Sequence, residues 1–168
     1  MMTVLTTSRL VLREFGIEDA TFIIELLNSP GWLQYIGDRN VKTIEQAVAY
    51  LNEGPLRTYR EFGFGLSCVT IKETGEPIGM CGLLRRGNLD HPDVGYAFLS
   101  AYHGQGYAEE IVGAMLVHAR TYHRFSTIYA ITLPNNSASI RLLEKLKMRY
   151  VKTLEYPGSF EQLSLYST

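Results

Sequence analysis

The sequence predicts an α+β fold, in which a mixed and largely antiparallel sheet of seven strands is flanked by about four helices. Short segments alternate apolar and polar residues, as strands do, and longer segments repeat apolar residues at helical spacing. A turn containing glycine and proline joins two strand segments directly, which requires an antiparallel pair. The chain of 168 residues contains no repeat, low-complexity segment or linker. We therefore expect a single domain over residues 1–168.

One strand and two helices are expected in the first part of the chain. Residues 9–15 place their leucines on one side of an extended chain, which predicts a strand. Residues 17–28 repeat apolar side chains at helical spacing behind two acidic residues, which predicts a helix that ends before Pro30. Residues 43–54 begin with a Thr and Gln capping box, and they predict a second helix that ends before Pro55.

Short strands follow from residue 63 onward. The turn at 74–77 joins the strands expected over 63–72 and 78–86, and a third strand is expected over 93–100. The remaining elements are a helix over 107–121, a strand over 126–133, a helix over 136–147, and two final strands over 149–156 and 159–166.

Composition and charge exclude several classes of protein. The formal net charge is -1, so the chain lacks the basic field that holds proteins on nucleic acid. No apolar run reaches the roughly 18 residues that a membrane span needs, and the first residues do not read as a signal peptide. We therefore expect a cytoplasmic protein with no nucleic-acid and no membrane partner.

The cysteines and histidines do not suggest a metal site. Cys68 and Cys81 match no zinc spacing, and we interpret them as small buried hydrophobic residues. His118 and His123 are five residues apart, whereas two ligands on one helical face are four apart. We therefore predict that the protein binds no metal.

Two glycines stand one residue apart between the strand at 93–100 and the helix at 107–121. Gly104 and Gly106 permit positive φ angles and a close approach of the backbone to a ligand, and the N–H groups at a helix start attract anions. A phosphate is the expected ligand, although a simple tight turn would use the same residues. The dinucleotide fingerprint does not fit, because Glu109 takes the place of its third glycine, and the GK pair of a P-loop is absent. What remains is a short loop around a pyrophosphate.

The stretch HGQGYAEE resembles the acyl-CoA pyrophosphate loop of the GNAT superfamily of N-acyltransferases. The superfamily pattern is Arg or Gln, two residues, Gly, one residue, then Gly or Ala. Here His103, Gly106 and Ala108 occupy these places, so the first position departs from the pattern. Three further stretches, TSRLVLREF, GEPIGMCGL and NNSASIRLLEKL, resemble the RimJ/RimL type, the ribosomal-protein N-terminal acetyltransferases. In order and spacing the four stretches cover nearly the whole chain, which is far more specific than one loop.

This resemblance implies a GNAT-like fold, acetyl-CoA as co-substrate and direct transfer of the acetyl group to an amine. The strands at 93–100 and 126–133 are expected to diverge and to open a slot for the thioester, with Asn136 and Ser139 near its sulfur. Asn136 fits equally well as the N-cap of the last helix, and the Ser139 hydroxyl fits a hydrogen bond to a carbonyl one turn earlier. The residues expected to contact the cofactor are Phe98, Leu99, His103, Gly104, Gln105, Gly106, Tyr107, Ala108, Asn136 and Ser139.

Direct transfer needs a neutral amine, a donor to the carbonyl oxygen and a proton for the leaving thiolate. Many GNAT enzymes supply that proton from a tyrosine, but Leu143 stands in its place, so Ser139 is expected to supply it, as the resemblance to the RimJ/RimL type implies. Backbone N–H groups near residues 98–99 are expected to polarise the carbonyl. Asp93 and Glu14 are the expected bases, and each fits a surface or salt-bridged carboxylate as well.

Trp32 and Tyr35 are expected to form an apolar lip of the acceptor site, although the same residues fit a core. The expected acceptor is a primary amine on a small molecule or a peptide, and the protein is expected to act as a monomer or homodimer. The alternative is a binding module that keeps the CoA cleft without the chemistry, because position 143 has no tyrosine and no base is obvious. Lys147 and Met148 replace a glycine and an aromatic residue of the RimJ/RimL pattern, which is expected to alter packing more than chemistry.

Overall fold

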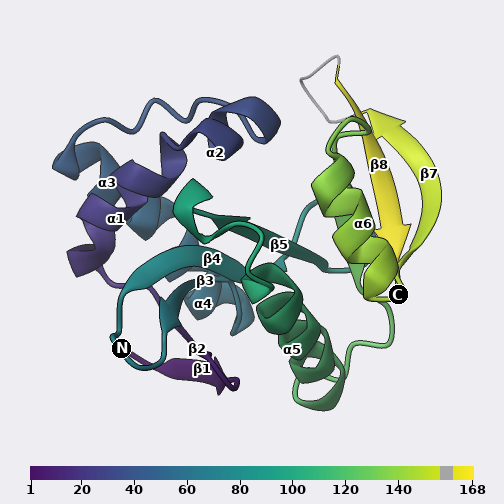
Figure 1. Cartoon of the computed structure of the whole chain (residues 1–168), viewed down its shortest axis with the longest axis horizontal. Helices are drawn as coiled ribbons and strands as arrows, with labels where there is room; N and C mark the ends of the chain where they lie inside the picture. Colours follow the sequence, from purple (N-terminus) through teal and green to yellow (C-terminus); the bar gives the residue numbers. More distant parts are fainter. Residues whose placement is uncertain (156–160) are drawn as a thin grey trace.

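The computed structural model describes residues 1–155 and 161–168, and its strands form one continuous sheet (Figure 1). Its eight strands are β1 (Thr3–Thr6), β2 (Leu10–Arg13), β3 (Leu66–Ile71), β4 (Pro77–Leu84), β5 (Asp93–Phe98), β6 (Tyr129–Thr132), β7 (Arg149–Glu155) and β8 (Gln162–Ser167). Their order across the sheet is β1-β2-β3-β4-β5-β6-β8-β7. Neighbouring strands are antiparallel except β5 and β6, which are parallel. The sheet is therefore mixed and largely antiparallel, as predicted.

Helices cover both faces of this sheet. The α-helices of the described residues are α1 (Ala20–Leu27), α2 (Pro30–Tyr35), α3 (Ile44–Glu53), α4 (Pro55–Phe62), α5 (Tyr107–Thr121) and α6 (Ser137–Lys145). Two 3₁₀ helices, η1 (Ile17–Asp19) and η2 (Ser100–Tyr102), precede α1 and the glycine loop. Within the described residues no helix has both the length and the apolar character needed to cross a membrane.

The structure has one strand and two helices more than the sequence predicts. β1 adds an antiparallel strand at the edge of the sheet, beside β2. α2 and α4 both begin at a proline, Pro30 and Pro55, where the sequence pattern indicated only a helix end. Proline suits the first turn of a helix, because the N–H that it lacks would have no intrahelical partner there. Each proline therefore ends one helix and starts the next.

The other predicted elements are present with shifted ends. The strand expected over 126–133 is confined to Tyr129–Thr132. β7 and β8 are the two expected final strands, and they pair antiparallel. The parts of that prediction at 156 and 159–160 lie outside the described residues.

Each face of the sheet has its own apolar core. α5 and α6 pack on one face against strand residues that include Cys81, and Figure 1 shows α5 crossing that face. α1 and α3 pack on the opposite face against Cys68 and Met80. Adjacent residues such as Met80 and Cys81 serve opposite cores because side chains alternate along a strand. Both cysteines are free and buried, which confirms their interpretation as small hydrophobic residues.

β5 is paired very differently along its two edges. On one edge it pairs with β4 from Asp93 to Phe98. On the other it meets β6 at a single pair, Asp93 with Tyr129. The two central strands therefore touch at one end and diverge toward the carboxyl end of β5, as expected. We call this divergence the splay, and the loop that starts α5 follows its open end (Figure 1).

Candidate active site

The loop between β5 and α5 is built on two glycines in the left-handed region. Gly104 has a φ of 72° and Gly106 a φ of 82°, which side chains with a Cβ rarely adopt. Gly106 is the N-cap residue of α5, so the N-cap supplies no side-chain hydrogen bond to the first N–H groups of that helix. A Cβ at Gly106 would also lie 3.3 Å from Nη2 of Arg9. The sequence pattern and the backbone therefore agree that both positions favour glycine.

Arg9 braces this loop from the other end of the chain, which sequence reasoning missed. Its Nε lies 2.7 Å from Oε2 of Glu110, and its Nη1 donates to the Gln105 carbonyl at 3.0 Å. Its guanidinium carbon lies 4.5 Å from the ring centroid of Tyr107, within the range of a cation–π contact. The other Glu110 oxygen accepts from the Arg9 N–H at 2.8 Å and from the Thr7 hydroxyl at 2.6 Å. The turn between β1 and β2 therefore fixes the first turn of α5.

Glu110 is held as a carboxylate by these contacts. Burial alone would raise its pKa, but the hydrogen bonds from Thr7 and Arg9 lower the pKa below its ordinary value. Arg9 itself is 46% exposed, so its positive charge remains accessible beside the glycine loop.

Two side chains of the loop bond to nearby carbonyl groups. Nε2 of His103 lies 2.9 Å from the Phe98 carbonyl oxygen, which requires that this nitrogen carry the proton. The side-chain amide of Gln105 donates to the Ala101 carbonyl at 2.9 Å. His103, the position that departs from the family pattern, thus fastens the loop to the end of β5.

The open edge of β5 presents one of the two expected backbone donors. The Leu99 N–H donates to the Ile78 carbonyl at 2.9 Å, so it is committed to β4 and does not face the splay. In an antiparallel ladder the N–H groups of alternate residues point to opposite edges. The N–H of Phe98, whose partner in β4 is Gly79, therefore points to the β6 side. This geometry corrects the expected role of the Leu99 N–H and retains that of Phe98.

The start of α6 lies on the other side of the splay. Oδ1 of Asn136 accepts from the Ser139 N–H at 3.2 Å, which confirms Asn136 as the N-cap. The Ser139 hydroxyl oxygen lies 2.7 Å from the hydroxyl oxygen of Tyr96, in the middle of β5. The serine therefore reaches across to the strand instead of bonding one turn back. Leu143, at the place of the missing tyrosine, is 1% exposed and belongs to the core.

Tyr96 is a second residue that sequence reasoning missed. It lies on the same face of β5 as Val94 and Phe98, which suggested an ordinary apolar strand. Burial raises the pKa of Tyr96 to about 12, so its hydroxyl stays protonated. Only the chemistry of the side chain could have revealed Tyr96 from the sequence. A tyrosine hydroxyl in a core needs a hydrogen-bond partner, and no neighbour in the sequence offers one.

The two expected bases lie in unfavourable places. Asp93 is 1% exposed, and Nε of Arg86 lies 3.0 and 3.1 Å from its two oxygens. Burial raises the pKa of Asp93, and the Arg86 charge acts against that rise. Because Asp93 sits at the single pair between β5 and β6, this ion pair anchors the closed end of the splay. Glu14 follows β2, and β3 and β4 separate β2 from β5, a distance of about 14 Å; the fold does not bring Glu14 to the splay.

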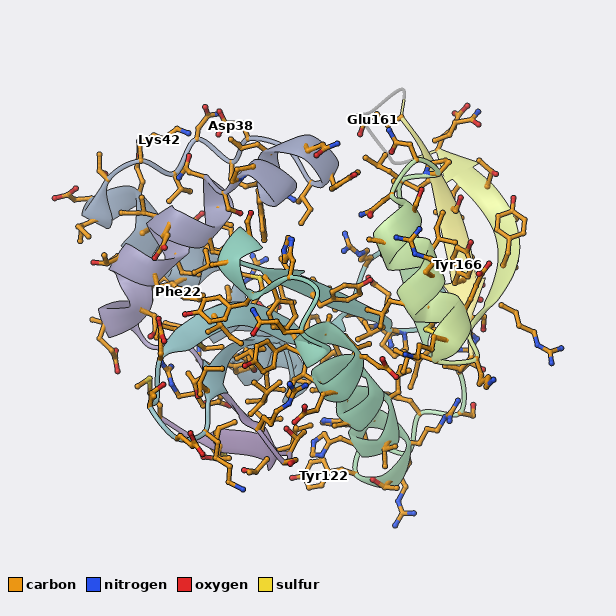
Figure 2. All side chains as sticks on the ribbon, viewed as in Figure 1. Phe22, Asp38, Lys42, Tyr122, Glu161 and Tyr166 are labelled. Carbon is orange, nitrogen blue, oxygen red and sulfur yellow. The ribbon has the colours of Figure 1, made fainter. Side chains whose placement is uncertain are left out.

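The structure places the two residues expected at the acceptor site in different surroundings. Trp32 is 6% exposed and lies in the core beside α1 and α3, so it is core rather than lip. Tyr35 lines a cavity of about 80 Å³ that joins α2 to the ends of β6 and β8. Glu161, at the start of β8 (Figure 2), also lines this cavity and was missed from the sequence. Among residues 1–155 and 161–168, no group of three or more His, Cys, Asp or Glu side chains is arranged to hold a metal ion.

Comparison with known proteins identifies the family. The Acetyltransferase (GNAT) domain matches residues 9–149. The chain is 33% identical over 155 residues to the uncharacterized protein YkkB of Bacillus subtilis (strain 168), covering 90% of this chain and 88% of that protein. It is 27% identical over 154 residues to the uncharacterized N-acetyltransferase YoaA of the same organism, covering 90% and 85%.

A solved structure shares the fold. The ribosomal-protein acetyltransferase RimL, in complex with coenzyme A, matches with a TM-score of 0.82 at 15% identity, over 99% of this chain and 97% of that one. Enzymes of the GNAT acetyltransferase family use acetyl-CoA. The match of the domain over most of the chain shows that this protein belongs to that family and is an acyltransferase.

Proposed function

We propose that the protein moves an acetyl group from acetyl-CoA by direct attack of a primary amine, carried by a small metabolite or by a protein N-terminus. The observation that carries this proposal is the uncapped start of α5, built on Gly104 and Gly106 at the open end of the splay. Helix N–H groups without a partner attract anions, and a diphosphate fits that preference. The fold shared with RimL, a ribosomal-protein acetyltransferase, supports a protein N-terminus as one class of acceptor.

Different residues of the loop hold the diphosphate in different ways. The backbone from Gly104 to Ala108 supplies the N–H groups, and Arg9 supplies a partly exposed positive charge beside them. His103 and Gln105 fix the shape of the loop by bonding the carbonyl groups of Phe98 and Ala101. We therefore assign Arg9 to the site, together with the expected loop residues.

The transfer step takes place within the splay. The amine nitrogen attacks the thioester carbonyl carbon, the C–S bond breaks, and its electron pair goes to the sulfur. The extra proton leaves the nitrogen for water or a carboxylate. The Phe98 N–H faces the β6 edge and is the donor for the carbonyl oxygen. Ser139 supplies a hydrogen bond to the sulfur, in place of the proton expected from the sequence, because an alcohol is a much weaker acid than a thiol.

The chemistry favours a weakly basic acceptor. Deprotonating an α-amino group of pKa near 8 costs only about 1 kcal/mol at pH 7, whereas a lysine near 10.4 costs about 4–5 kcal/mol. Asp93 is engaged in a buried ion pair and Glu14 lies about 14 Å from β5, so neither provides a strong base at the splay. The cytoplasmic location and the assembly as monomer or homodimer stay predictions.

A two-part experiment tests the proposal. Calorimetry with acetyl-CoA measures binding, and a thiol-release assay measures turnover with peptide N-termini, polyamines, aminoglycosides and free amino acids. We expect micromolar binding and release that depends on one acceptor class. Tight binding with no acceptor-dependent release would favour the binding module, to which the buried Leu143 points. No heat from acetyl-CoA would exclude both functions.

A further inference from the structure

The contact between Tyr96 and Ser139 joins the two sides of the splay. Tyr96 lies in the middle of β5, Ser139 lies in the first turn of α6, and their hydroxyl oxygens are 2.7 Å apart. Resting on the proposed function, we infer that Tyr96 is a positioning residue, which holds the Ser139 hydroxyl so that its O–H points at the sulfur of the leaving coenzyme A. This inference gives a side chain of β5 a role in the departure of the thiol. The proposed function assigns only the glycine loop, the Phe98 N–H and Ser139.

Ser139 has little freedom apart from the rotation of its hydroxyl. Its backbone N–H is held by Oδ1 of Asn136 at 3.2 Å, which fixes the first turn of α6. A serine inside a helix commonly bonds back to a carbonyl one turn earlier, but here the hydroxyl bonds to that of Tyr96. The direction of the serine proton is therefore decided by Tyr96.

At this distance either hydroxyl could donate, and we assign the phenol as the donor. A phenol is a much stronger acid than an alcohol, so it is also the stronger hydrogen-bond donor. If Tyr96 donates to the Ser139 oxygen, the serine proton is left to donate onward. A hydroxyl that accepts one hydrogen bond becomes a better donor of the next, because the chain is polarised. The pair thus directs and strengthens one donor toward the splay.

Tyr96 orients this donor but does not supply the proton. Burial raises the pKa of Tyr96 to about 12, whereas a free thiol has a pKa near 8.5. Moving a proton from this phenol to the thiolate would therefore be unfavourable by roughly 3,000-fold. Cys81, which lies across from Tyr96 in β4, is also buried with its pKa raised to about 12, so it is a neutral neighbour.

The step balances without either residue changing its charge. The C–S bond of the thioester breaks as the C–N bond forms, and the electron pair goes to the sulfur. Ser139 donates a hydrogen bond to the thiolate and keeps its proton. The thiolate then takes a proton from water, since its pKa lies above neutral pH.

The test measures the pKa of the thiol of bound coenzyme A, from the ultraviolet absorption of the thiolate as the pH is raised. This measurement needs no acceptor. It compares wild type with Tyr96→Phe, Ser139→Ala and the double variant. We expect Ser139→Ala to raise the thiol pKa by about one unit and Tyr96→Phe to raise it by about half a unit, because a hydrogen bond to a charged sulfur is lost or misdirected. The double variant is expected to match Ser139→Ala, because Tyr96 acts only through the serine.

Tyr59→Phe is the matched control. The Tyr59 hydroxyl lies on α4, its pKa is likewise raised to about 12 by burial, and it bonds to the Leu66 carbonyl. Its loss removes a buried phenol hydroxyl away from the splay, so the thiol pKa is expected to stay at the wild-type value. Thermal unfolding of Tyr96→Phe and Tyr59→Phe checks that both variants are folded. Ser139→Thr keeps a hydroxyl and is expected to keep a thiol pKa near wild type.

The outcomes separate this inference from the proposed function. A thiol pKa unchanged in Tyr96→Phe, with wild-type affinity for coenzyme A, overturns the inference and leaves the proposed function standing. Additive shifts in the double variant also overturn it, because Tyr96 would then act without Ser139. Absence of coenzyme A binding by the wild-type protein removes the proposed function itself. With an active acceptor, Tyr96→Phe is expected to lower kcat about threefold, because half a pKa unit corresponds to about a threefold change. The KM for acetyl-CoA is expected to change little.

Discussion

The helices α5 and α6 lie on the same face of the sheet, yet they begin in opposite ways. α5 begins at Gly106, which has no side chain to offer, whereas α6 begins at Asn136, whose side chain accepts from the Ser139 N–H. A capped start satisfies the helix itself, and an uncapped start keeps its N–H groups for a ligand. Under the proposed function, the start of α5 binds the cofactor, whereas the start of α6 stabilises its own helix and positions Ser139.

The uncapped start is stabilised from outside the helix. Glu109 and Glu110 lie in the first turn of α5, where negative charge is favourable. Glu110 is held by Arg9 and Thr7, and Glu109 forms an ion pair at 2.8 Å with Lys145 of α6. Both carboxylates of the first turn of α5 therefore bond to neighbouring elements of the fold, and contacts with Arg9, Thr7 and Lys145 hold them there.

The largest expected effect comes from adding a side chain at the uncapped start. Gly106→Val places a β-branched residue at a φ of 82° and puts a Cβ 3.3 Å from Arg9 Nη2. We expect the affinity for acetyl-CoA, measured by calorimetry, to fall at least 30-fold, or about 2 kcal/mol. Gly63→Val is the control, because Gly63 has a φ of 74° at the end of α4, and its effect is expected on stability alone. Equal affinity of Gly106→Val and wild type would remove the loop from the site.

Removing the Arg9 side chain is expected to have a smaller effect on the first turn of α5. Arg9→Ala removes the ion pair with Glu110, the hydrogen bond to the Gln105 carbonyl and the contact with the Tyr107 ring. We expect acetyl-CoA affinity to fall about fivefold and to become less sensitive to salt, because one exposed charge near the diphosphate is lost. Arg57→Ala is the matched control, since Arg57 forms only an exposed pair with Glu61 at 3.9 Å. If Arg9 has no role in binding, Arg9→Ala and Arg57→Ala will have the same affinity for acetyl-CoA.

The parts predicted from the sequence are those that a short segment defines by itself. The sequence predicts the turn at Gly104 and Gly106 because neighbouring residues define a turn between strand and helix. For the same reason Asn136 fits a helix cap, as one of its two expected roles. Helix α2 was missed because six residues give too few turns to show a period, and α4 was missed because its eight residues, PLRTYREF, include few apolar side chains. Their prolines were therefore read as ends alone.

The rest of the site depends on contacts between distant segments. Arg9 and Glu110 are 101 residues apart in sequence, and Tyr96 and Ser139 are 43 apart. No local pattern encodes such pairs, because the fold brings them together only when the sheet order is known. The same order explains why Glu14, a reasonable base in sequence, is remote from the splay.

Lys147 shows how the resemblance and the structure inform each other. It occupies a position with a φ of 67°, and it stands where the RimJ/RimL pattern has glycine. The backbone requirement of that pattern is thus retained although the residue is not, at a cost of about 1 kcal/mol for a side chain in the left-handed region. Met148, which follows, is 2% exposed and fills the core position of the family's aromatic residue.

The smallest expected effect on the cofactor comes from the capped start. Asn136→Ala removes the acceptor of the Ser139 N–H, and we expect the free energy of unfolding in urea to fall by about 1 kcal/mol. Acetyl-CoA affinity is expected to fall less than twofold, because the diphosphate loop lies on the other helix. Asn135→Ala is the control, since the neighbouring Asn135 does not cap α6, and its stability is expected to match wild type. A loss of affinity as large as that of Gly106→Val would mean that both helix starts bind the cofactor, and the contrast between them would then lie only in how each start is built.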